Sequence, residues 1–480
     1  MIEQRRTKIV ATLGPASSTE EIIEKLLKVG VDVIRLNFSH GHMNDHRNRV
    51  RLVRSISNKL GRSVAIMGDL QGPKLRIAGF KNDKVFLNSG DKFILSINHP
   101  KEDGNSKIVG IDYKNLVQDC KEGDELILDD GRVELIVERI SKDCIYTKVS
   151  IGGPLSSNKG INRRGGGLSA PSLTDKDKED IKFVAELELD YLAVSFLRYK
   201  DDIEIVRSLV RNTGSLAWII VKIERAEAVV DNQSLDSLIE ASDGVMVARG
   251  DLGVEVGEAE LVGIQKRIIQ RARTFNKLVI TATQMMESMI LNPIPTRAEV
   301  SDIANAVLDY TDAVMLSAES ASGKYPIEAV QAMARICIGA EKHPTAISSQ
   351  HRLGEIFTRC DETIALSAMY AANHFPGIKA IITLTESGQT PLIMSRIRSG
   401  IPIYSYSPHR ATLNRVSLFR GVTPLQFDAL NYSLENMNYA AINQLKMLNF
   451  VKNGDWIVLA RGNLERNSGG TNTLQILKVE

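Results

Sequence analysis

Short apolar runs alternate with amphipathic stretches in two separate parts of the chain, before residue 71 and after residue 173. The strand-like runs cover residues 8–14, 31–38, 63–70, 191–196, 217–224, 243–250, 277–284 and 312–319. Stretches with the apolar period of a helix separate these runs. Three strands before the interruption and five after it make eight βα units, which favours a closed (β/α)8 TIM barrel. An open doubly wound sheet is the alternative.

Two capping boxes indicate helix starts within this alternation. Ser18 followed by Glu21 predicts that a helix begins at Ser18, and Thr296 followed by Glu299 predicts another. We therefore expect an ordinary helix between the first two strands and another between the last two.

Residues 72–171 break the rhythm with glycines, charges and short β-like runs such as VFLN, KFILSI and ELIVERI. This composition predicts an inserted all-β lid domain with no good helix. A third α/β region begins near residue 344. Its strands are predicted at residues 380–386, 401–407, 454–461 and 474–479. The predicted domains are residues 1–71 and 172–343 for the barrel, 72–171 for the insert and 344–480 for the C-terminal α/β domain.

Composition narrows the function classes. The chain is 43% hydrophobic and 25% charged, with a net charge of only +2, so we expect no nucleic-acid partner and no membrane surface. Four cysteines in 480 residues are too few for a disulfide framework. The start, MIEQRRTKIV, lacks the apolar core of a signal peptide. A cytoplasmic protein is expected.

Polar residues gather where the predicted strands end, which is the face on which TIM barrels build active sites and which favours the barrel over the open sheet. These residues are Asn37, Asp69, Glu224, Asp251, Thr283 and Glu319. Strand alternation puts Lys222 and Glu224 on one face, suited to holding an anion and a metal. Glu224 and Asp251 predict a Mg2+ site, since Mg2+ takes one or two protein carboxylates. A buried ion pair and a plain turn are the structural alternatives.

Each of the other candidate residues is weak evidence when it is taken alone. Arg35 and Arg76 have the charge to clamp a phosphate, although a single arginine is usually a surface residue. Thr283 and Ser317 supply hydroxyl groups at strand ends, where they are more often helix caps.

Six segments in order are similar to signature segments of the pyruvate kinase family. They are RLNFSHG, GDLQGPKLR, VKIERAEAV, VMVARGDLGVE, TATQMMESM and AVMLSAES. The resemblance extends from Arg5 to Glu480 and implies transfer of the phosphoryl group of phosphoenolpyruvate to ADP, with the insert acting as a lid.

The resemblance also implies roles for individual residues. It makes Lys222 the cation that stabilises the phosphoryl group, Glu224 and Asp251 the Mg2+ ligands, and Arg35 and Arg76 phosphate contacts. The substrate carboxylate is received by the backbone of Ala248, Arg249, Gly250 and Asp251. The resemblance makes Lys159 a nucleotide-binding lysine and places Thr283 at the substrate. It makes Ser317 and Glu319 members of a proton relay.

Family members that need K+ bind it through residues matching Asn37, Ser39 and Asp69 and the carbonyl of Leu70. Such members typically have glutamate where this chain has Lys74. A lysine brings its own positive charge, so we expect K+ to be dispensable.

The C-terminal region resembles the family's regulatory domain, with Thr385, Ser387, Gly388, Gln389 and Thr390 in its phosphate-binding loop. Glu386 and Gln389 stand where cations are frequent in members activated by fructose 1,6-bisphosphate. This favours AMP or a sugar monophosphate as effector, and the resemblance implies a homotetramer.

Two other functions stay open at this stage. A Mg2+-dependent barrel lyase or aldolase would use the same carboxylates without needing the lid, Arg76 or Lys159. A degenerate relative that only binds ligands should have lost Lys222 or a metal carboxylate, and this chain keeps both.

Overall fold

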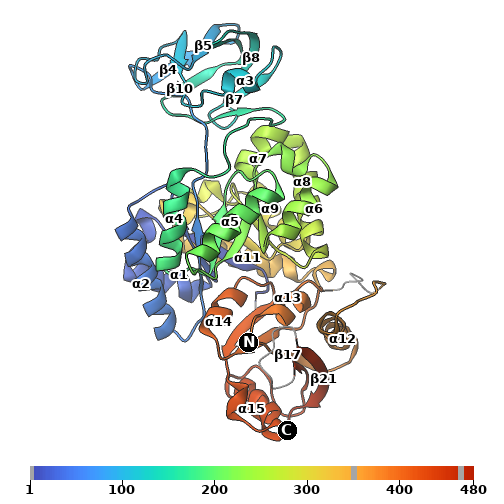
Figure 1. Cartoon of the computed structure of the whole chain (residues 1–480). Coiled ribbons are helices and arrows are strands. Elements are labelled where there is room, and N and C mark those ends of the chain that lie inside the picture. The colour runs from blue at the N-terminus through green and yellow to red at the C-terminus, as the bar shows by residue number, and fades with distance from the viewer. Residues whose placement is uncertain (1–4, 348–353, 463–469) are drawn as a thin grey trace.

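The computed structural model describes residues 5–347, 354–462 and 470–480. The first four residues, on which the expectation of no signal peptide partly rests, lie outside these ranges. Figure 1 shows three bodies in a row, with the β-rich insert at the top, the barrel in the middle and the C-terminal domain below. None of the described helices has both the length and the apolar character needed to cross a membrane.

Eight parallel strands close into a barrel in the order β1-β16-β15-β14-β13-β12-β3-β2, so the prediction of a closed barrel is confirmed and the open sheet is excluded. The strands are β1 (Lys8–Thr12), β2 (Val33–Asn37), β3 (Ala65–Asp69), β12 (Tyr191–Val194), β13 (Trp218–Ile223), β14 (Gly244–Ala248), β15 (Leu278–Ala282) and β16 (Ala313–Leu316). Nearly all their residues are buried, which explains their apolar sequences.

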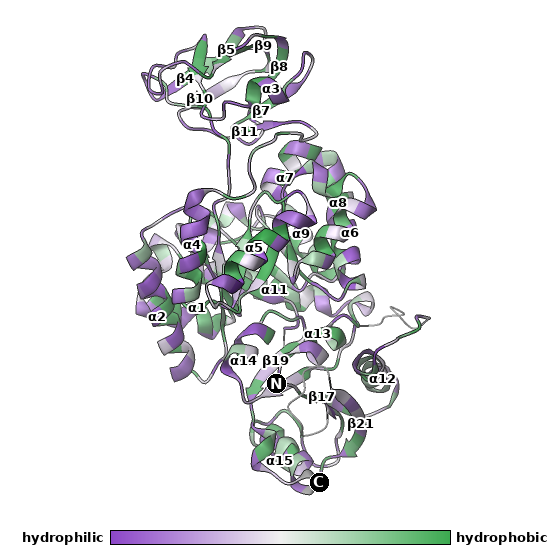
Figure 2. Cartoon of the chain, viewed as in Figure 1, coloured by the Kyte–Doolittle hydropathy of each residue, from purple (hydrophilic) through white to green (hydrophobic). Residues whose placement is uncertain are grey.

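Helices surround the barrel and present hydrophilic residues outward, as Figure 2 shows for α2 and α4. They are α1 (Glu20–Val29), α2 (Met43–Lys59), α4 (Asp175–Glu186), α5 (Lys200–Asn212), α6 (Asn232–Ala241), α7 (Arg249–Val256), α8 (Glu258–Thr274), α9 (Arg297–Leu308), α10 (Ala318–Ala321) and α11 (Pro326–Glu341). The capping box of Thr296 and Glu299 is confirmed at the start of α9.

The expected capping box of Ser18 and Glu21 is wrong. Thr19 caps α1, because its hydroxyl accepts from Ile22 N, while the Ser18 hydroxyl donates to Gly14 O at 2.6 Å. A short helical turn before α1 engages Ser18, so the helix begins one residue later than the sequence pattern indicates.

The insert consists of a six-stranded sheet in the order β11-β7-β8-β9-β5-β6 and the pair β10-β4. Its elements are β4 (Lys84–Leu87), β5 (Lys92–Ser96), β6 (Ile108–Gly110), α3 (Leu116–Asp119), β7 (Glu125–Leu128), β8 (Val133–Ile140), β9 (Cys144–Ile151), β10 (Gly153–Ser156) and β11 (Ile161–Arg163). The four-residue α3 is an addition to the expected β structure. Two chain segments join this lid to the barrel (Figure 1).

The C-terminal domain is a five-stranded sheet in the order β19-β18-β17-β20-β21 with flanking helices. Its elements are α12 (Cys360–His374), β17 (Ile378–Leu384), α13 (Gln389–Ser395), β18 (Ile403–Ser407), α14 (Arg410–Val416), β19 (Val422–Gln426), α15 (Leu434–Met447), β20 (Trp456–Gly462) and β21 (Thr471–Lys478). Strand β19 was not predicted, because Pro424 argues against a strand; β19 lies at a sheet edge, where proline is tolerated.

The C-terminal domain packs against the N-terminal ends of the barrel strands. Interior barrel residues such as Met246 and Ile280 belong to one buried apolar cluster together with Ile393 and Phe419 of the C-terminal domain. The opposite ends of the strands therefore face the lid.

Candidate active site

The C-terminal ends of six barrel strands bring the predicted residues to one face. Lys222 lies on β13, and Glu224 directly follows that strand. Asp251 lies in the first turn of α7, after β14, and Thr283 follows β15. The rest are Arg35 and Asn37 on β2, Asp69 on β3, and Ser317 and Glu319 after β16.

Lys222 forms the centre of this group. Its ammonium nitrogen lies 2.8 Å from Glu224 Oε1 and 3.4 Å from Asp69 Oδ1, and it donates to Ser195 Oγ at 2.7 Å. Burial lowers the pKa of Lys222, but Asp69 and Glu224 outweigh burial, so that the pKa is raised. The lysine therefore stays charged and available to an anion.

Arg35 completes the charge pairing. Its Nε donates to Asp69 Oδ2 at 2.6 Å, and Nη1 donates to Thr12 Oγ1 at 3.0 Å. Burial raises the pKa of Asp69, but Arg35 and Lys222 outweigh burial and lower it. Asp69 is thus an ionised carboxylate that orients both cations.

Glu224 has the features of a metal ligand. Its Oε2 accepts from Phe196 N at 2.8 Å, whereas the buried Oε1 faces the Lys222 ammonium at 2.8 Å and accepts no backbone hydrogen bond among the residues described. Burial raises the pKa of Glu224, and the nearby charge of Asp251 raises it further. A divalent cation between these two carboxylates would satisfy Oε1 and lower that pKa. The residues present therefore fit Mg2+.

No cluster of three or more His, Cys, Asp or Glu side chains suited to a metal occurs among the residues described. Two carboxylates suffice for Mg2+ when substrate oxygens and water supply the other positions.

The ammonium of Lys74 pairs with Asp251 and Asp130 rather than with a side chain of the predicted K+ site. Its ammonium contacts Asp251 Oδ1 at 3.0 Å and Asp130 Oδ1 of the lid at 3.6 Å. Two of the predicted K+ ligands accept hydrogen bonds within the protein: Asn37 Oδ1 accepts from Ser39 N at 3.1 Å, and Leu70 O accepts from the Ser195 hydroxyl at 2.9 Å. Asp69 pairs with Arg35 and Lys222.

Thr283 adopts a conformation that is rare for a β-branched residue, with φ of 64°. Its hydroxyl accepts from Gly250 N at 2.9 Å, and its carbonyl accepts from Arg249. The Arg249 guanidinium is bound to both oxygens of Asp302, at 2.8 and 2.7 Å, so this side chain stabilises the turn. Such strain persists only where the surroundings enforce it.

Ser317 and Glu319 lie beside Thr283. Glu319 Oε2 accepts from Ser317 N at 2.7 Å, and Oε1 accepts from Met286 N at 3.2 Å. Glu319 is buried and ties the ends of β15 and β16 together.

Arg76 and Lys159 are held by lid groups rather than by the barrel. Arg76 Nη1 donates to Asn158 O at 2.8 Å, and Lys159 Nζ lies 2.7 Å from Asp129. The structure therefore keeps these two residues apart from the six strand ends.

The predicted effector loop forms a turn before α13. Thr385 Oγ1 accepts from Gly388 N at 2.9 Å, and Ser387 Oγ accepts from Gln389 N at 3.4 Å. Gly388 has φ of 88°, and a Cβ there would lie 2.9 Å from Val416 Cγ1, so glycine is required. Thr390 is buried with its hydroxyl 2.6 Å from Thr471 Oγ1.

Sequence reasoning missed Thr12 and Ser195, which hydrogen-bond to Arg35 and Lys222. Both lie at the ends of predicted strands. The signal that would have indicated them is a Ser or Thr near the end of a predicted barrel strand.

Comparison with known proteins agrees with this geometry. The family description "Pyruvate kinase, barrel domain" matches residues 4–330, and "Pyruvate kinase, alpha/beta domain" matches residues 362–477. The chain is 56% identical to pyruvate kinase II of Salmonella typhimurium over 476 residues, which cover 99% of each protein. It is 52% identical to a pyruvate kinase of Haemophilus influenzae over 99% of each. A pyruvate kinase of Buchnera aphidicola subsp. Schizaphis graminum is 55% identical, over 99% of this chain and 98% of that protein.

Replacing Lys222 by methionine should lower kcat by about 10²–10³ while the fold is kept, the scale expected for one lost transition-state cation. Steady-state kinetics and circular dichroism would measure both effects. The matched control is Lys277→Met, because Lys277 lies at the opposite end of the barrel and donates to Glu240 O and Ser242 O. Equal losses in the two variants would remove Lys222 from the mechanism.

The ordered match of both domain descriptions, together with relatives of 52–56% identity over the whole chain, shows that this chain belongs to the pyruvate kinase family of phosphotransferases.

Proposed function

We propose that the strand ends around Lys222 transfer the phosphoryl group of phosphoenolpyruvate to ADP, giving pyruvate and ATP in the last step of glycolysis. The observation that carries the proposal is the arrangement of the Lys222 ammonium between the buried carboxylates of Glu224 and Asp69. A fixed cation beside a metal-binding carboxylate suits phosphoryl transfer, which depends on positioning and charge stabilisation.

Glu224 and Asp251 would hold Mg2+, which supplies positive charge to the transferred phosphoryl oxygens when it is bound. Lys222 and Arg35 supply further fixed charge from the barrel side. Helix α7 begins at Arg249, so the N–H groups of its first turn have no intrahelical acceptor; apart from that of Gly250, which donates to Thr283 Oγ1, they are suited to the substrate carboxylate. These groups hold the substrate at both of its acidic ends.

The proton that converts the enolate to pyruvate would arrive from the side of Thr283, Ser317 and Glu319. The Thr283 hydroxyl donates to its neighbour's carbonyl, Ala282 O, at 2.7 Å and accepts from Gly250, so its orientation is fixed. Glu319 positions Ser317 through the backbone N–H. Closure of the lid would bring Arg76 and Lys159 to the nucleotide and exclude water, which limits hydrolysis.

The assay that tests the proposal is pyruvate release from phosphoenolpyruvate, coupled to lactate dehydrogenase. We expect activity that requires both ADP and Mg2+ and disappears with chelator. ADP-independent release would favour a lyase or aldolase instead, and a protein that binds phosphoenolpyruvate without turnover would be a binding protein.

The proposal includes the finer expectations from the family resemblance, which are allosteric control, a homotetramer and a cytoplasmic location. The effector would be AMP or a sugar monophosphate bound at Thr385, Ser387, Gly388, Gln389 and Thr390. Glu386 supports this choice because its carboxylate lies 2.5 Å from His409 Nε2 and adds negative charge beside the loop. A bisphosphate would meet more repulsion there than a monophosphate.

Effector choice can be tested by titrating AMP, ribose 5-phosphate, glucose 6-phosphate and fructose 1,6-bisphosphate at subsaturating phosphoenolpyruvate. We expect the monophosphates to activate, and Ser387→Asp to abolish activation by repelling phosphate. The control is Ser433→Asp, since Ser433 caps α15 in the same domain and aspartate caps equally well. Activation by the bisphosphate alone would contradict this assignment.

Catalysis is expected not to require K+. Asp69 is already paired with Arg35 and Lys222, and Lys74 adds a positive charge at Asp251. We expect near-full activity in tetramethylammonium buffer free of K+ and NH4+.

Lys74→Glu should create a K+ requirement, and Lys84→Glu on an exposed lid strand serves as the matched control. Strong stimulation of the unmodified enzyme by K+ would refute the expectation.

A further inference from the structure

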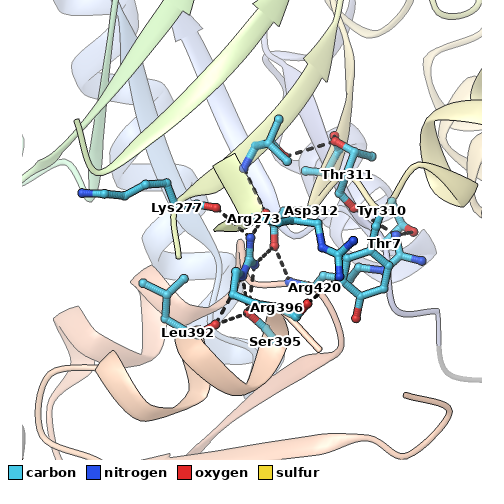
Figure 3. Close-up of polar contacts among 12 residues, drawn as sticks. Thr7, Arg273, Lys277, Tyr310, Thr311, Asp312, Leu392, Ser395, Arg396 and Arg420 are labelled. Carbon is cyan, nitrogen blue, oxygen red and sulfur yellow. Dashed lines mark hydrogen bonds and ion pairs between the residues drawn. The ribbon is translucent and has the colours of Figure 1, made fainter. Parts of the chain in front are cut away.

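The lower rim of the barrel, formed by the N-terminal ends of its strands, contains a buried polar cluster shared with the C-terminal domain. Figure 3 shows its centre, where Arg396 at the end of α13 meets Asp312, the residue directly before β16. Both side chains are 1% exposed. This cluster lies at the far end of the strands from the proposed active site.

The guanidinium of Arg396 uses all five of its N–H donors. Nη1 donates to Asp312 Oδ2 and Lys277 O, both at 2.7 Å, and Nη2 donates to Asp312 Oδ1 and Ser395 Oγ. Nε faces Leu392 O and Ser395 Oγ at 3.3 Å. The two parallel bonds to Asp312 fix both orientation and distance.

Both carboxylate oxygens of Asp312 accept hydrogen bonds, and the residue connects β15, β16 and β1. Its Oδ2 also accepts from Val279 N of β15 at 2.9 Å, and its Oδ1 accepts from Arg420 N at 3.1 Å. Through its backbone, Asp312 donates to Val279 O at 2.9 Å and accepts from Lys8 N at 2.8 Å. One carboxylate therefore fixes the lower ends of β15 and β16 against α13.

Neighbouring groups hold the chain after α13 in place. Arg273 Nη2 donates to Arg396 O at 2.9 Å, and the Tyr310 hydroxyl donates to Ile397 O at 2.8 Å. Arg273 and Arg420 each lie 4.4 Å from the centre of the Tyr310 ring. Burial, and then the nearby arginines, lower the pKa of Arg273 to about 10. Burying this many charged groups between two domains costs desolvation free energy.

Stability alone does not explain such a pair. Replacing a buried ion pair by apolar residues of similar volume is often neutral or stabilising, whereas geometric specificity is a role that apolar contacts fill less well. In this cluster, the geometry that the ion pair fixes is that of the lower ends of β15 and β16. Their upper ends lead directly into Thr283 and Ser317, which the proposed function places at proton transfer.

Strand β15 has five residues and β16 has four, so only about 15 Å of extended chain separates the lower rim from these hydroxyl groups. Buried strands in a closed barrel are stiff, and a displacement at one end is carried to the other. Thr283 is also strained, with φ of 64°, and depends on its surroundings to keep that geometry.

We propose that Asp312 and Arg396 are positioning residues, whose buried pair sets the height of β15 and β16 and thereby places Thr283 and Ser317 for proton transfer at the opposite end of the barrel. The inference rests on the proposed function. It predicts that disturbing the pair impairs protonation of the enolate more than it impairs phosphoryl transfer, because Lys222 and Glu224 belong to the end of β13 and Asp251 to the helix after β14.

The test separates the two steps in Arg396→Lys, which keeps the charge but loses the double hydrogen bond, and in Asp312→Asn, which keeps the shape. Proton transfer is measured as exchange of the pyruvate methyl protons with D2O by NMR, in the presence of Mg2+ and ATP. In this exchange the enzyme removes a methyl proton to give the enolate, and a deuteron then restores the ketone. Phosphoryl transfer is measured as ATP synthesis by rapid quench in a single turnover.

The ratio of exchange to phosphoryl transfer should fall about tenfold in both variants, a modest misplacement on the scale of catalytic positioning. The matched control is Arg398→Lys. Arg398 stabilises the same junction by donating to Thr345 O at 2.7 Å and Leu308 O at 3.1 Å, but it has no bond to Asp312. In Arg398→Lys the ratio of exchange to phosphoryl transfer should stay at the wild-type value. This should hold even if its thermal unfolding midpoint falls as much as those of the two test variants.

An unchanged ratio in whichever of the two variants folds would overturn the proposal. An equal change in Arg398→Lys would also overturn it, by showing that any weakening of the junction has this effect. ATP synthesis by the unmodified enzyme decides the proposed function separately, so the failure of one inference is distinguishable from the failure of the other.

Discussion

The ammonium of Lys222 lies between two buried carboxylates at the barrel mouth, and the other site residues are arranged around this contact. Asp69 and Glu224 are each 1% exposed, so neither charge has water to stabilise it. Removing one member of a buried ion pair typically costs 3–5 kcal/mol, because it leaves an uncompensated charge. Arg35 balances the charge on Asp69, in addition to the phosphate contact proposed for it. The site is a set of mutually dependent charges rather than a collection of independent ligands.

The mutual dependence of these charges also explains why the pKa of Glu224 is raised. Its pKa is raised because burial and the charge of Asp251 together outweigh the attraction of Lys222. A divalent cation removes the conflict, since it pairs with both carboxylates at once. The geometry of the mouth thus favours metal binding while keeping Lys222 charged and directed at the substrate.

Some of this arrangement could be predicted from the sequence, and the reasons differ between residues. Strand alternation placed Lys222 beside Glu224, and the count of eight βα units predicted the barrel. The contact of Lys222 with Asp69 could not be derived in this way, because β13 and β3 are not neighbours in the sheet but are separated by β12. Lys74 lies on the segment between two domains, where no periodicity fixes direction, and its contact with Asp251 was missed. Strand β19 was missed because Pro424 conceals an edge strand.

Helix α7 links the metal site to the lid. Its first turn carries Asp251, and one turn later Glu255 accepts from the lid's Asn162 at 3.3 Å, while Glu255 O accepts from Gly165 N at 3.0 Å. Residues four apart lie on the same face of a helix, so lid and metal contacts share one face of α7. A change in the position of the lid therefore acts on the same eight-residue helix that presents Asp251 and the N–H groups suited to the substrate carboxylate. Because α7 follows the buried strand β14 directly and Glu255 also accepts from Ala226 N of the barrel at 2.8 Å, this short helix joins the lid, the barrel and the proposed metal ligand Asp251.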